Sequence, residues 1–189
     1  MRISIISEYG YKEALLGLGL SYGLTEHCSV NDIDGELLER LEKVAITLAG
    51  RGGGEDKFLR QITVYLDLDL PLYMWSQFDT YKVGTVAQSE SKMHTLKRKE
   101  LTKNDFNFYI TDEDLSRYNS LSPLSKGSLI RLDFLQRRIV SCNYAVLDTI
   151  IKQRKKHKLY EWREFCECIY NHIKYPELLE KAWKGTKEA

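Results

Sequence analysis

The chain has 189 residues, a length that accommodates one domain with a sizeable core. Hydrophobic residues make up 43% of it and charged residues 29%, a composition that excludes a globally disordered chain. The 28 Lys and Arg residues almost balance the 27 Asp and Glu residues, so no global field attracts nucleic acid or a membrane surface. Any anion site must therefore be built locally.

Cysteine usage and hydropathy predict the compartment. No window approaches the roughly 18 consecutive apolar residues that span a bilayer, and the apolar run at residues 1–6 is too short for a signal peptide. The chain has 4 Cys residues, and the Cys166-x-Cys168 pair has no second pair or His spacing to complete a zinc site. We therefore expect reduced structural cysteines, no metal site, no membrane association and a cytoplasmic location.

The first half of the chain begins with a strand at residues 3–7 and a short helix at residues 11–22. Residues 31–34 carry N-cap candidates, and the apolar positions from Leu37 to Leu48 recur at helical spacing. This pattern predicts a second helix, which the glycines after Arg51 stop.

Residues 61–70 alternate apolar and polar side chains, which predicts a central β-strand. Pro71 either ends this strand or opens the next helix in its first turn, and residues 72–78 form an aromatic-rich helical start. Residues 82–92 contain Gly, Thr and Ser with few bulky apolar side chains, so we expect a loop or an irregular segment there.

Residues 125–155 carry Leu, Ile and Val at helical spacing, which predicts a long helix or a helix pair with Arg137 and Arg138 in its middle. Residues 159–173 predict a last amphipathic helix. The order of strand, helices, strand and helices indicates one α+β domain over residues 1–189.

Residues 71–93 are crowded with amide, hydroxyl and ammonium groups. Such a segment suits a phosphate and a polar heterocycle, although a solvated surface loop has the same composition. The groups in question belong to Gln77, Lys82, Thr85, Gln88, Ser89, Ser91 and Lys92.

A second segment of interest carries Arg137, Arg138, Arg154 and Arg163. The planar guanidinium fork can hold a phosphate or a uracil-like edge with two parallel hydrogen bonds. The alternative is that Arg163 forms only the solvated edge of the last helix. The basic run at residues 152–158 raises nucleic-acid binding as a further alternative, but cations near the negative end of a helix dipole explain it as well.

The first segment resembles the signature of the flavin-dependent thymidylate synthase family. In that family a strand, a proline turn and a Gln precede Arg-His-Arg, a Ser, Asn-Glu and a closing Ser-x-Arg. Here residues 61–70, Pro71 and Gln77 match the lead-in in order. The signature itself is degenerate. Thr80-Tyr81-Lys82 stands in place of Arg-His-Arg, and Thr85 stands in place of the first Ser. Further along, Ala87-Gln88 replaces Asn-Glu, Glu90 replaces the second Ser and Lys92 replaces the last Arg.

The C-terminal half is similar to the same family. The family carries an Asn and an Arg on a long helix, a second Arg near the end of that helix, and Glu-Ile-Arg at the start of another. Asn143, Arg154 and Glu161-Trp162-Arg163 follow this order. The first helix Arg departs from it, because Ala145 stands near its place and Arg138 would have to substitute from an earlier position.

The resemblance implies an α+β fold with an antiparallel or mixed sheet and long helices. It also implies a flavin-dependent methyltransferase that modifies C5 of a deoxypyrimidine monophosphate, converting dUMP to dTMP or a related product. FAD would be the cofactor, with NADPH and methylenetetrahydrofolate as co-substrates. The alternative is a non-catalytic nucleotide-binding relative of the same fold.

The resemblance further assigns roles to residues. Arg163 matches the Arg that activates the pyrimidine, and Thr80, Tyr81, Lys82 and Thr85 stand at cofactor-binding positions. The substrate-binding set is Gln77, Gln88, Ser89, Ser91, Lys92, Arg138 and Arg163. Family sites form between the subunits of a homotetramer, and the 12 Tyr, 6 Phe and 3 Trp residues are compatible with an aromatic interface.

Overall fold

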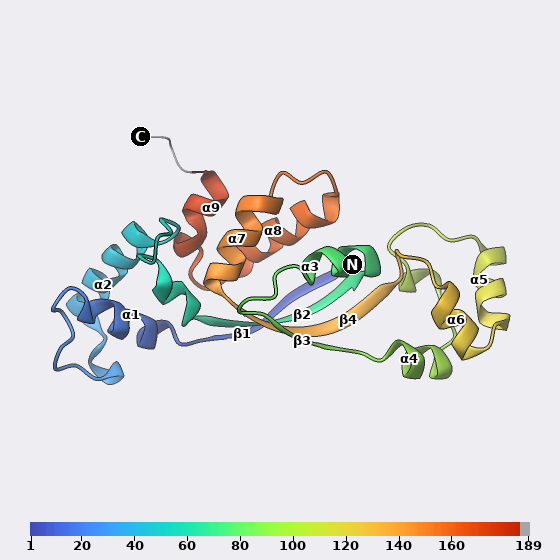
Figure 1. Ribbon diagram of the computed structural model, residues 1–189, viewed down its shortest axis with the longest axis horizontal. Helices are drawn as coiled ribbons and strands as arrows, with labels where there is room; N and C mark the ends of the chain where they lie inside the picture. The colour runs from blue at the N-terminus through green and yellow to red at the C-terminus, as the bar shows by residue number, and fades with distance from the viewer. Residues whose placement is uncertain (186–189) are drawn as a thin grey trace.

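A computed structural model describes residues 1–185, which form an elongated molecule with a β-sheet at its centre (Figure 1). The helices α3, α7, α8 and α9 lie on one side of the sheet. The helices α1 and α2 lie at one end of the molecule, and α4, α5 and α6 lie at the other. Within residues 1–185, no helix covers the middle of the opposite side of the sheet.

The sheet is antiparallel throughout, with the strand order β1-β2-β4-β3. Its strands are β1 (Arg2–Tyr9), β2 (Thr63–Pro71), β3 (Val86–Ser89) and β4 (Leu135–Asn143). The register between β1 and β2 shifts between Ile5 and Ser7. The α+β fold and the central position of the strand predicted at residues 61–70 are both confirmed.

Side-chain alternation along β2 determines which face of the sheet is buried. Val64, Leu66, Leu68 and Leu70 are all 0% exposed and belong to the main core beneath the helices. Their polar neighbours along β2 face the open side, because successive side chains of a strand point to opposite faces. Burying one Leu side chain contributes about 1.5–3 kcal/mol, so this face fixes the register of the strand.

The helices lie on one side of this sheet and at its two ends. The α-helices are α1 (Tyr11–Leu20), α2 (Gly35–Leu48), α3 (Leu72–Phe78), α4 (Lys92–Arg98), α5 (Asp112–Ser120), α6 (Pro123–Leu129), α7 (Tyr144–Arg154), α8 (Tyr160–His172) and α9 (Glu180–Lys184). The 3₁₀ helices are η1 (Val30–Asp32), η2 (Lys57–Arg60), η3 (Lys103–Asp105) and η4 (Pro176–Leu179). The helices expected from the sequence at residues 11–22, 72–78 and 159–173, and the helix expected after the N-cap candidates at residues 31–34, are confirmed as α1, α3, α8 and α2.

The prediction of a long helix or a helix pair with Arg137 and Arg138 in its middle is wrong for the middle of residues 125–155, which forms β4; the two ends of the segment belong to α6 and α7. The spacing of leucine and isoleucine in this segment is compatible with the helical period of about 3.6 residues and with the strand period of about 2. Residues 135–143 form a strand because they pair with β2 along its whole length. Arg137 and Arg138 therefore do not lie in a helix but on opposite faces of β4. Arg137 forms an ion pair with Asp67 on the open face, at 2.8 Å.

The expectation of a loop or irregular segment at residues 82–92 is also partly wrong. Residues 86–89 form the edge strand β3, which pairs with β4 over its whole length. All side chains of β3 are exposed, so no apolar face marks this strand in the sequence. The strand β3 forms because its backbone hydrogen-bonds to β4, which is a tertiary contact.

Residues 90–134 form a small lobe at one end of the molecule, with its own core of Leu96, Leu101, Phe106, Ile110 and Phe134. The lobe is fastened to the main body by Asn107. The Asn107 amide donates to the Glu161 carboxylate at 2.8 Å and to the Tyr73 hydroxyl at 3.0 Å. Tyr73 donates to the same Glu161 carboxylate, which is 1% exposed.

The cysteines of the described chain are free thiols. Burial raises the pKa of Cys142 and of Cys166 to about 12, so both thiols stay protonated at neutral pH. Among residues 1–185, no helix has both the length and the apolar character required to cross a membrane.

Gly10, between β1 and α1, offers a test of the fold. Its φ is +87°, and a Cβ there would lie 2.5 Å from the Gln61 carbonyl oxygen just before β2. Gly53 also has a positive φ, +64°, but a Cβ there meets nothing within 4 Å. We expect Gly53→Ala to lower the free energy of unfolding by about 1–2 kcal/mol for the left-handed backbone alone, and Gly10→Ala to lower it by clearly more. Urea unfolding of both variants measures the difference, and equal losses would contradict the close approach.

Candidate functional site

The candidate site is centred on Gln77 at the end of α3. The Gln77 Oε1 atom accepts hydrogen bonds from Trp162 Nε1 at 2.8 Å and from Arg154 Nη1 at 3.3 Å. Trp162, on α8, is fully buried and stacks on Phe78 with the ring centroids 6.0 Å apart. The amide of Gln77 is thus oriented by α7 and α8, two helices far from it in sequence.

Arg154, in the last turn of α7, joins Gln77 to Tyr81. Its Nε donates to the Tyr81 hydroxyl at 2.9 Å, and that hydroxyl donates to Gln153 Oε1 at 2.8 Å. The guanidinium carbon lies 5.0 Å from the centre of the Trp162 ring, within cation–π range. Arg154 forms no ion pair with any residue between 1 and 185, so its positive charge is available to an anion.

Arg138, on β4, is already neutralised within the protein. Its Nη1 contacts the Asp79 carboxylate at 2.8 Å, and its guanidinium lies 4.1 Å above the Trp75 ring. Gln136 accepts from two further nitrogens of the same guanidinium. Ser89 is the register partner of Arg138 across β3 and β4, so both side chains point to the same face.

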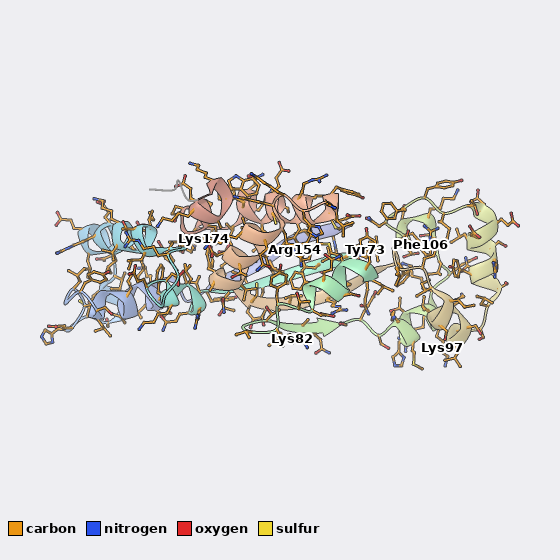
Figure 2. All side chains as sticks on the ribbon, turned by 45° about the horizontal axis from the view of Figure 1, so that its top comes forward. Tyr73, Lys82, Lys97, Phe106, Arg154 and Lys174 are labelled. Carbon is orange, nitrogen blue, oxygen red and sulfur yellow. The ribbon has the colours of Figure 1, made fainter. Side chains whose placement is uncertain are left out.

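A cleft of about 360 Å³ lies beside this cluster, between the segment after α3 and the start of α7. It is lined by Arg60, Thr80, Tyr81, Lys82, Val83, Gly84, Asn143, Ala145, Val146 and Thr149. Three of the four residues predicted to bind the cofactor, Thr80, Tyr81 and Lys82, therefore share one cleft. Figure 2 shows Lys82 and Arg154 on the segments that flank this region.

The floor of the cleft depends on Gly84 and Asn143. The Asn143 Oδ1 atom accepts from Val146 N at 3.1 Å and caps α7. Gly84 has a φ of +79°, and a Cβ there would lie 2.8 Å from Asn143 Nδ2. The fourth predicted cofactor residue, Thr85, follows directly, and its buried hydroxyl has no hydrogen-bond partner in the described chain.

The structure does not bring the other predicted residues into this cluster. Gln88 pairs with Ile139 and so faces the open side of the sheet. Ser91 caps α4, where its hydroxyl accepts from His94 N at 3.4 Å, and Lys92 is the first residue of that helix. Arg163 is exposed, and its Nη1 donates to the His157 and Lys158 carbonyls between α7 and α8.

Sequence reasoning left Trp162 and Arg154 out of the candidate site residues. The sequence places Arg154 among the arginines that can hold a phosphate or a uracil-like edge and in the family's order, but the resemblance does not include it in the substrate-binding set. The signal that could have found it is its position, in the last turn of a helix that follows an Asn N-cap. Only the crossing of α7 and α8 places its guanidinium against Gln77.

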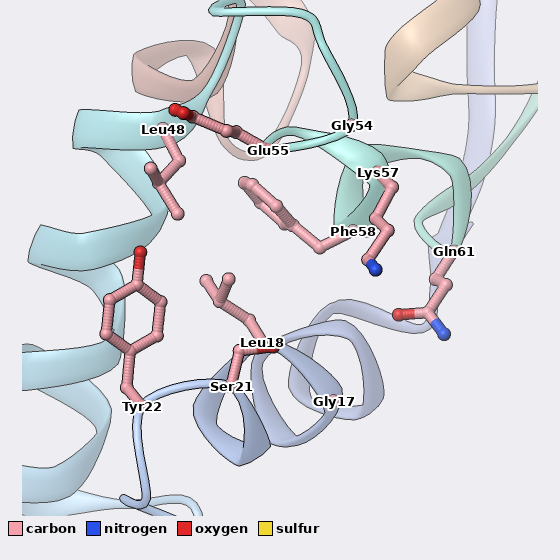
Figure 3. A pocket seen from close by; sticks show the side chains of 10 residues that line it. All are labelled: Gly17, Leu18, Ser21, Tyr22, Leu48, Gly54, Glu55, Lys57, Phe58 and Gln61. Atoms are coloured by element: carbon pink, nitrogen blue, oxygen red, sulfur yellow. The ribbon is translucent and has the colours of Figure 1, made fainter.

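A larger cavity of about 550 Å³ lies elsewhere, between α1, α2 and residues 54–61 (Figure 3). Leu18, Leu48 and Phe58 point into it, and Lys57 and Gln61 stand at one side. None of the cofactor-binding or substrate-binding residues predicted from the sequence lines this cavity. Its lining mixes apolar side chains with the charged pair Glu55 and Lys57, whereas the cleft beside Tyr81 adjoins the guanidinium of Arg154.

Comparison with known proteins identifies the fold. No protein-family model matches the sequence, and no curated protein matches it. The structure is similar to that of thymidylate synthase X (ThyX) from Helicobacter pylori with FAD and dUMP, with a TM-score of 0.77 and 10% identity over 97% of this chain and 100% of that chain. A second structure of the flavin-dependent ThyX from the same organism, complexed with FAD and dUMP, gives a TM-score of 0.74 and 10% identity over 96% and 99% of the two chains.

A third similar structure is the UMP/dUMP methylase PolB from Streptomyces cacaoi bound with 5-Br dUMP. Its TM-score is 0.66, with 10% identity over 97% of this chain and 94% of that chain. The chain therefore has the fold of the flavin-dependent thymidylate synthases, as the degenerate motif implied. At this identity the likeness establishes the fold alone.

Replacement of Arg154 tests the cluster. Arg154→Met removes the charge and leaves Gln77 Oε1 and the Tyr81 hydroxyl each without one partner. Because hydrogen bonds to charged groups contribute about 1.5–3 kcal/mol each, we expect a loss of unfolding free energy of this order in urea. The exposed Arg40 on α2 gives the matched control Arg40→Met, which should change stability little. Equal effects of the two substitutions would contradict the cluster.

His157, between α7 and α8, should make stability depend on pH. Burial, and then the nearby charges of Arg154, Arg163 and Lys158, lower the pKa of His157 below its usual value. The folded state thus prefers neutral His157. The contribution of neutral His157 to the free energy of unfolding is complete above the pKa of the unfolded state, about 6.5, and is lost as the pH falls through the lower pKa of the folded state.

We therefore expect the loss of stability of the wild type below about pH 6.5 to be smaller in His157→Gln. Thermal unfolding from pH 8 to pH 5 measures this, with the exposed His94→Gln as control. An unchanged pH profile in His157→Gln would exclude this role.

Proposed function

We propose that the protein transfers a one-carbon unit to C5 of a deoxypyrimidine monophosphate in a flavin-dependent reaction, converting dUMP to dTMP or a related product. The observation that carries the proposal is the unneutralised guanidinium of Arg154, held against Gln77, Tyr81 and Trp162 in a fold whose solved examples hold FAD and dUMP. A fixed cation beside a planar aromatic cluster suits an anionic nucleotide with a flat base.

The proposed chemistry needs a stabilised negative charge on the pyrimidine. Attack by C5 on the one-carbon donor develops charge on the ring, and an oriented guanidinium close to the ring lowers the energy of that state. We assign this role to Arg163, whose Nη1 is already fixed by two backbone carbonyls. Gln77, Arg138 and Ser89 would orient the nucleotide from one subunit, whereas Gln88, Ser91 and Lys92, which lie outside this cluster, would contribute only from a second copy of the chain.

The cofactor residues fit a flavin in part. Lys82 lines the cleft and offers a positive charge there. The Thr85 hydroxyl is buried next to the cleft without a partner in the described chain, so it would reach a ligand only after a local rearrangement. FAD, when bound, would supply the reducing equivalents, with NADPH and methylenetetrahydrofolate as co-substrates. The cleft volume of about 360 Å³ lies near the lower end of ligand sites, which range from about 300 to 1,000 Å³. We therefore assign it to a portion of the cofactor.

A second copy of the chain would complete the site. The open face of the sheet carries Ile6, Tyr9, Tyr65 and Val86, which are 53%, 63%, 40% and 71% exposed. Exposed aromatic and aliphatic groups on one face favour an interface between subunits. We propose a homotetramer with composite sites that acts in the cytoplasm, where nucleotide substrate and reduced thiols coexist. Light scattering that gives a monomer at micromolar concentration would contradict the composite site.

The alternative is a nucleotide-binding protein that no longer catalyses. It is favoured by the ion pair between Arg138 and Asp79, which consumes one of the candidate cations. The sequence of residues 80–82 also favours this alternative. Lys82 is the one charged side chain at the three positions where the family has Arg-His-Arg, so an anionic cofactor would be held less firmly.

Calorimetric titration with dUMP tests the nucleotide site. The wild type should bind saturably, and Arg163→Ala and Arg154→Met should each weaken binding. A lost charge-assisted hydrogen bond of about 1.5–3 kcal/mol corresponds to an increase in Kd of about 10- to 150-fold. Arg40→Met should bind as the wild type does. Wild-type affinity in both Arg163→Ala and Arg154→Met would move the site elsewhere.

Reconstitution separates the two candidate functions. The protein is mixed with excess FAD, dUMP, methylenetetrahydrofolate and NADPH, and the nucleotide is analysed by mass. A modified nucleotide that depends on FAD supports the enzyme. Binding of dUMP with no product, and no change in the flavin absorbance spectrum on adding protein, supports the non-catalytic relative.

A further inference from the structure

The boundary between the small lobe and the main body is built around the first turn of α3. The lobe has a hydrophobic core of its own, separate from the main core, and Leu72 is the α3 residue that packs against it. Figure 2 shows Tyr73, the next residue, at the end of the main body that faces the lobe, where Phe106 lies. The position of the lobe relative to the main body therefore depends on the contacts made at this boundary.

Two backbone hydrogen bonds at the boundary start from α3. Leu72 N and Tyr73 N are the first amides of the helix, so they have no acceptor within it. They donate instead to the carbonyls of Phe134 and Leu132, each at 3.1 Å. Both carbonyls belong to the segment in which the chain returns from the lobe into β4. The two amides thus report directly on whether the lobe stays attached to the main body.

A buried side-chain network joins the same two parts. Glu161, in the first turn of α8, is 1% exposed, and its Oε1 atom accepts from the Asn107 amide at 2.8 Å and from the Tyr73 hydroxyl. The Asn107 amide also donates to the hydroxyls of Tyr73 at 3.0 Å and Tyr160 at 3.2 Å. Burial, and then the hydrogen bond to Glu161, raise the pKa of Tyr73, so its hydroxyl stays protonated and can donate. One lobe residue is therefore joined to α3 and α8 through one carboxyl group.

The second oxygen of this carboxyl group is left unsatisfied. The Glu161 Oε2 atom is buried without a hydrogen-bond partner in the described chain, and Glu161 forms no ion pair within residues 1–185. Such burial is costly in either form, because the charged form loses its hydration and the neutral form has an O–H group with no acceptor. The helix dipole favours an acidic residue in the first turn of α8, but an exposed one would gain as much. Packing alone therefore does not explain an acidic side chain at this position.

The network determines where the first turn of α8 lies. The N-cap residue of α8 is Leu159, whose apolar side chain cannot cap the helix. Glu161 is followed directly by Trp162, which donates to Gln77 at 2.8 Å, and then by Arg163, which we assign to the pyrimidine ring. A shift of this turn would move both side chains relative to the nucleotide site.

We propose that Glu161 is a positioning residue, which holds the small lobe and the first turn of α8 in one arrangement through Tyr73 and Asn107. The lobe carries residues 91 and 92 of the predicted substrate-binding set, and α8 carries Arg163. Fixing the lobe determines where its substrate-binding residues lie for a second copy of the chain. The effect on the nucleotide rests on the proposed function, whereas the attachment of the lobe is measured without a ligand.

Asn107→Asp tests the network from the lobe side. This change keeps the size of the side chain but places a second carboxyl group against that of Glu161. In native-state hydrogen exchange, the amides of Leu72 and Tyr73 should exchange about tenfold faster or more, as expected for the loss of a hydrogen bond to an acidic group. The amides of β2 should exchange as in the wild type. Asn104→Asp, at an exposed position in the same lobe, should leave all these rates unchanged.

The amide of Leu115 separates detachment of the lobe from its unfolding. Leu115 N donates to the Thr111 carbonyl at 3.0 Å, a bond that lies within the lobe. Detachment accelerates exchange at Leu72 and Tyr73 while Leu115 keeps its wild-type rate. Equal acceleration at all three amides would mean that Asn107→Asp only unfolds the lobe, and would overturn the proposal.

Glu161→Gln supplies a rescue that a merely structural role does not predict. In Glu161→Gln alone, the amide oxygen can still accept from Tyr73 and Asn107, so the exchange rates should change little. When it is combined with Asn107→Asp, its amide nitrogen can donate to the new carboxyl group, and the rates should return towards those of the wild type. The matched control combines Asn107→Asp with Glu167→Gln, an exposed position on α8, and should show no rescue at the same net charge. Additive losses in the first pair would overturn the network.

Calorimetric titration with dUMP tests the link to the nucleotide site. Asn107→Asp should raise the Kd for dUMP about threefold or more, because only the fraction of molecules with an attached lobe binds fully, and the pair with Glu161→Gln should recover. Faster exchange at Leu72 and Tyr73 together with unchanged dUMP binding would overturn the positioning role. If the wild type itself does not bind dUMP, the proposed function fails and the positioning role fails with it, whereas the exchange rates still decide whether the network holds the lobe.

Discussion

Burial of one face of β2 is the constraint on which the rest of the structure depends. Val64, Leu66, Leu68 and Leu70 are fully buried, and the helices that cover them all lie on the same side of the sheet. This arrangement determines the position of α3, which follows β2 directly through Pro71. It also brings α7 and α8 over α3, so Gln77, Arg154 and Trp162 meet at one junction.

The same one-sided covering leaves polar and aromatic groups on the opposite face. At one end of this face Arg2 and Arg137 both contact the carboxylate of Asp67, and the hydrogen bond from Arg137 lowers the pKa of Asp67. At the other end the Tyr9 and Tyr65 rings meet edge to face, with the centroids 6.3 Å apart.

Electrostatics separates the arginines into two kinds. Arg138 and Arg137 are neutralised by Asp79 and Asp67, so they stabilise the sheet and its connection to α3. Arg154 is half-buried, and no ion pair within residues 1–185 neutralises its charge. The unneutralised charges are where ligands are expected, because a balanced ion pair has little left to offer an anion.

The sequence by itself determined the fold class, the central strand and the helices α1, α2, α3 and α8, because each carries a buried face whose period is visible along the chain. It also carried enough of a degenerate motif to indicate the flavin-dependent thymidylate synthase fold and to single out Thr80, Tyr81 and Lys82, which share one cleft.

Only the tertiary structure decided β3 and β4, since an exposed edge strand and a strand with ambiguous spacing acquire their form from pairing with a neighbour. Tertiary structure alone likewise placed Arg154 against Gln77. The charge balance of a side chain depends on which residues pack around it, and a linear sequence does not contain that information.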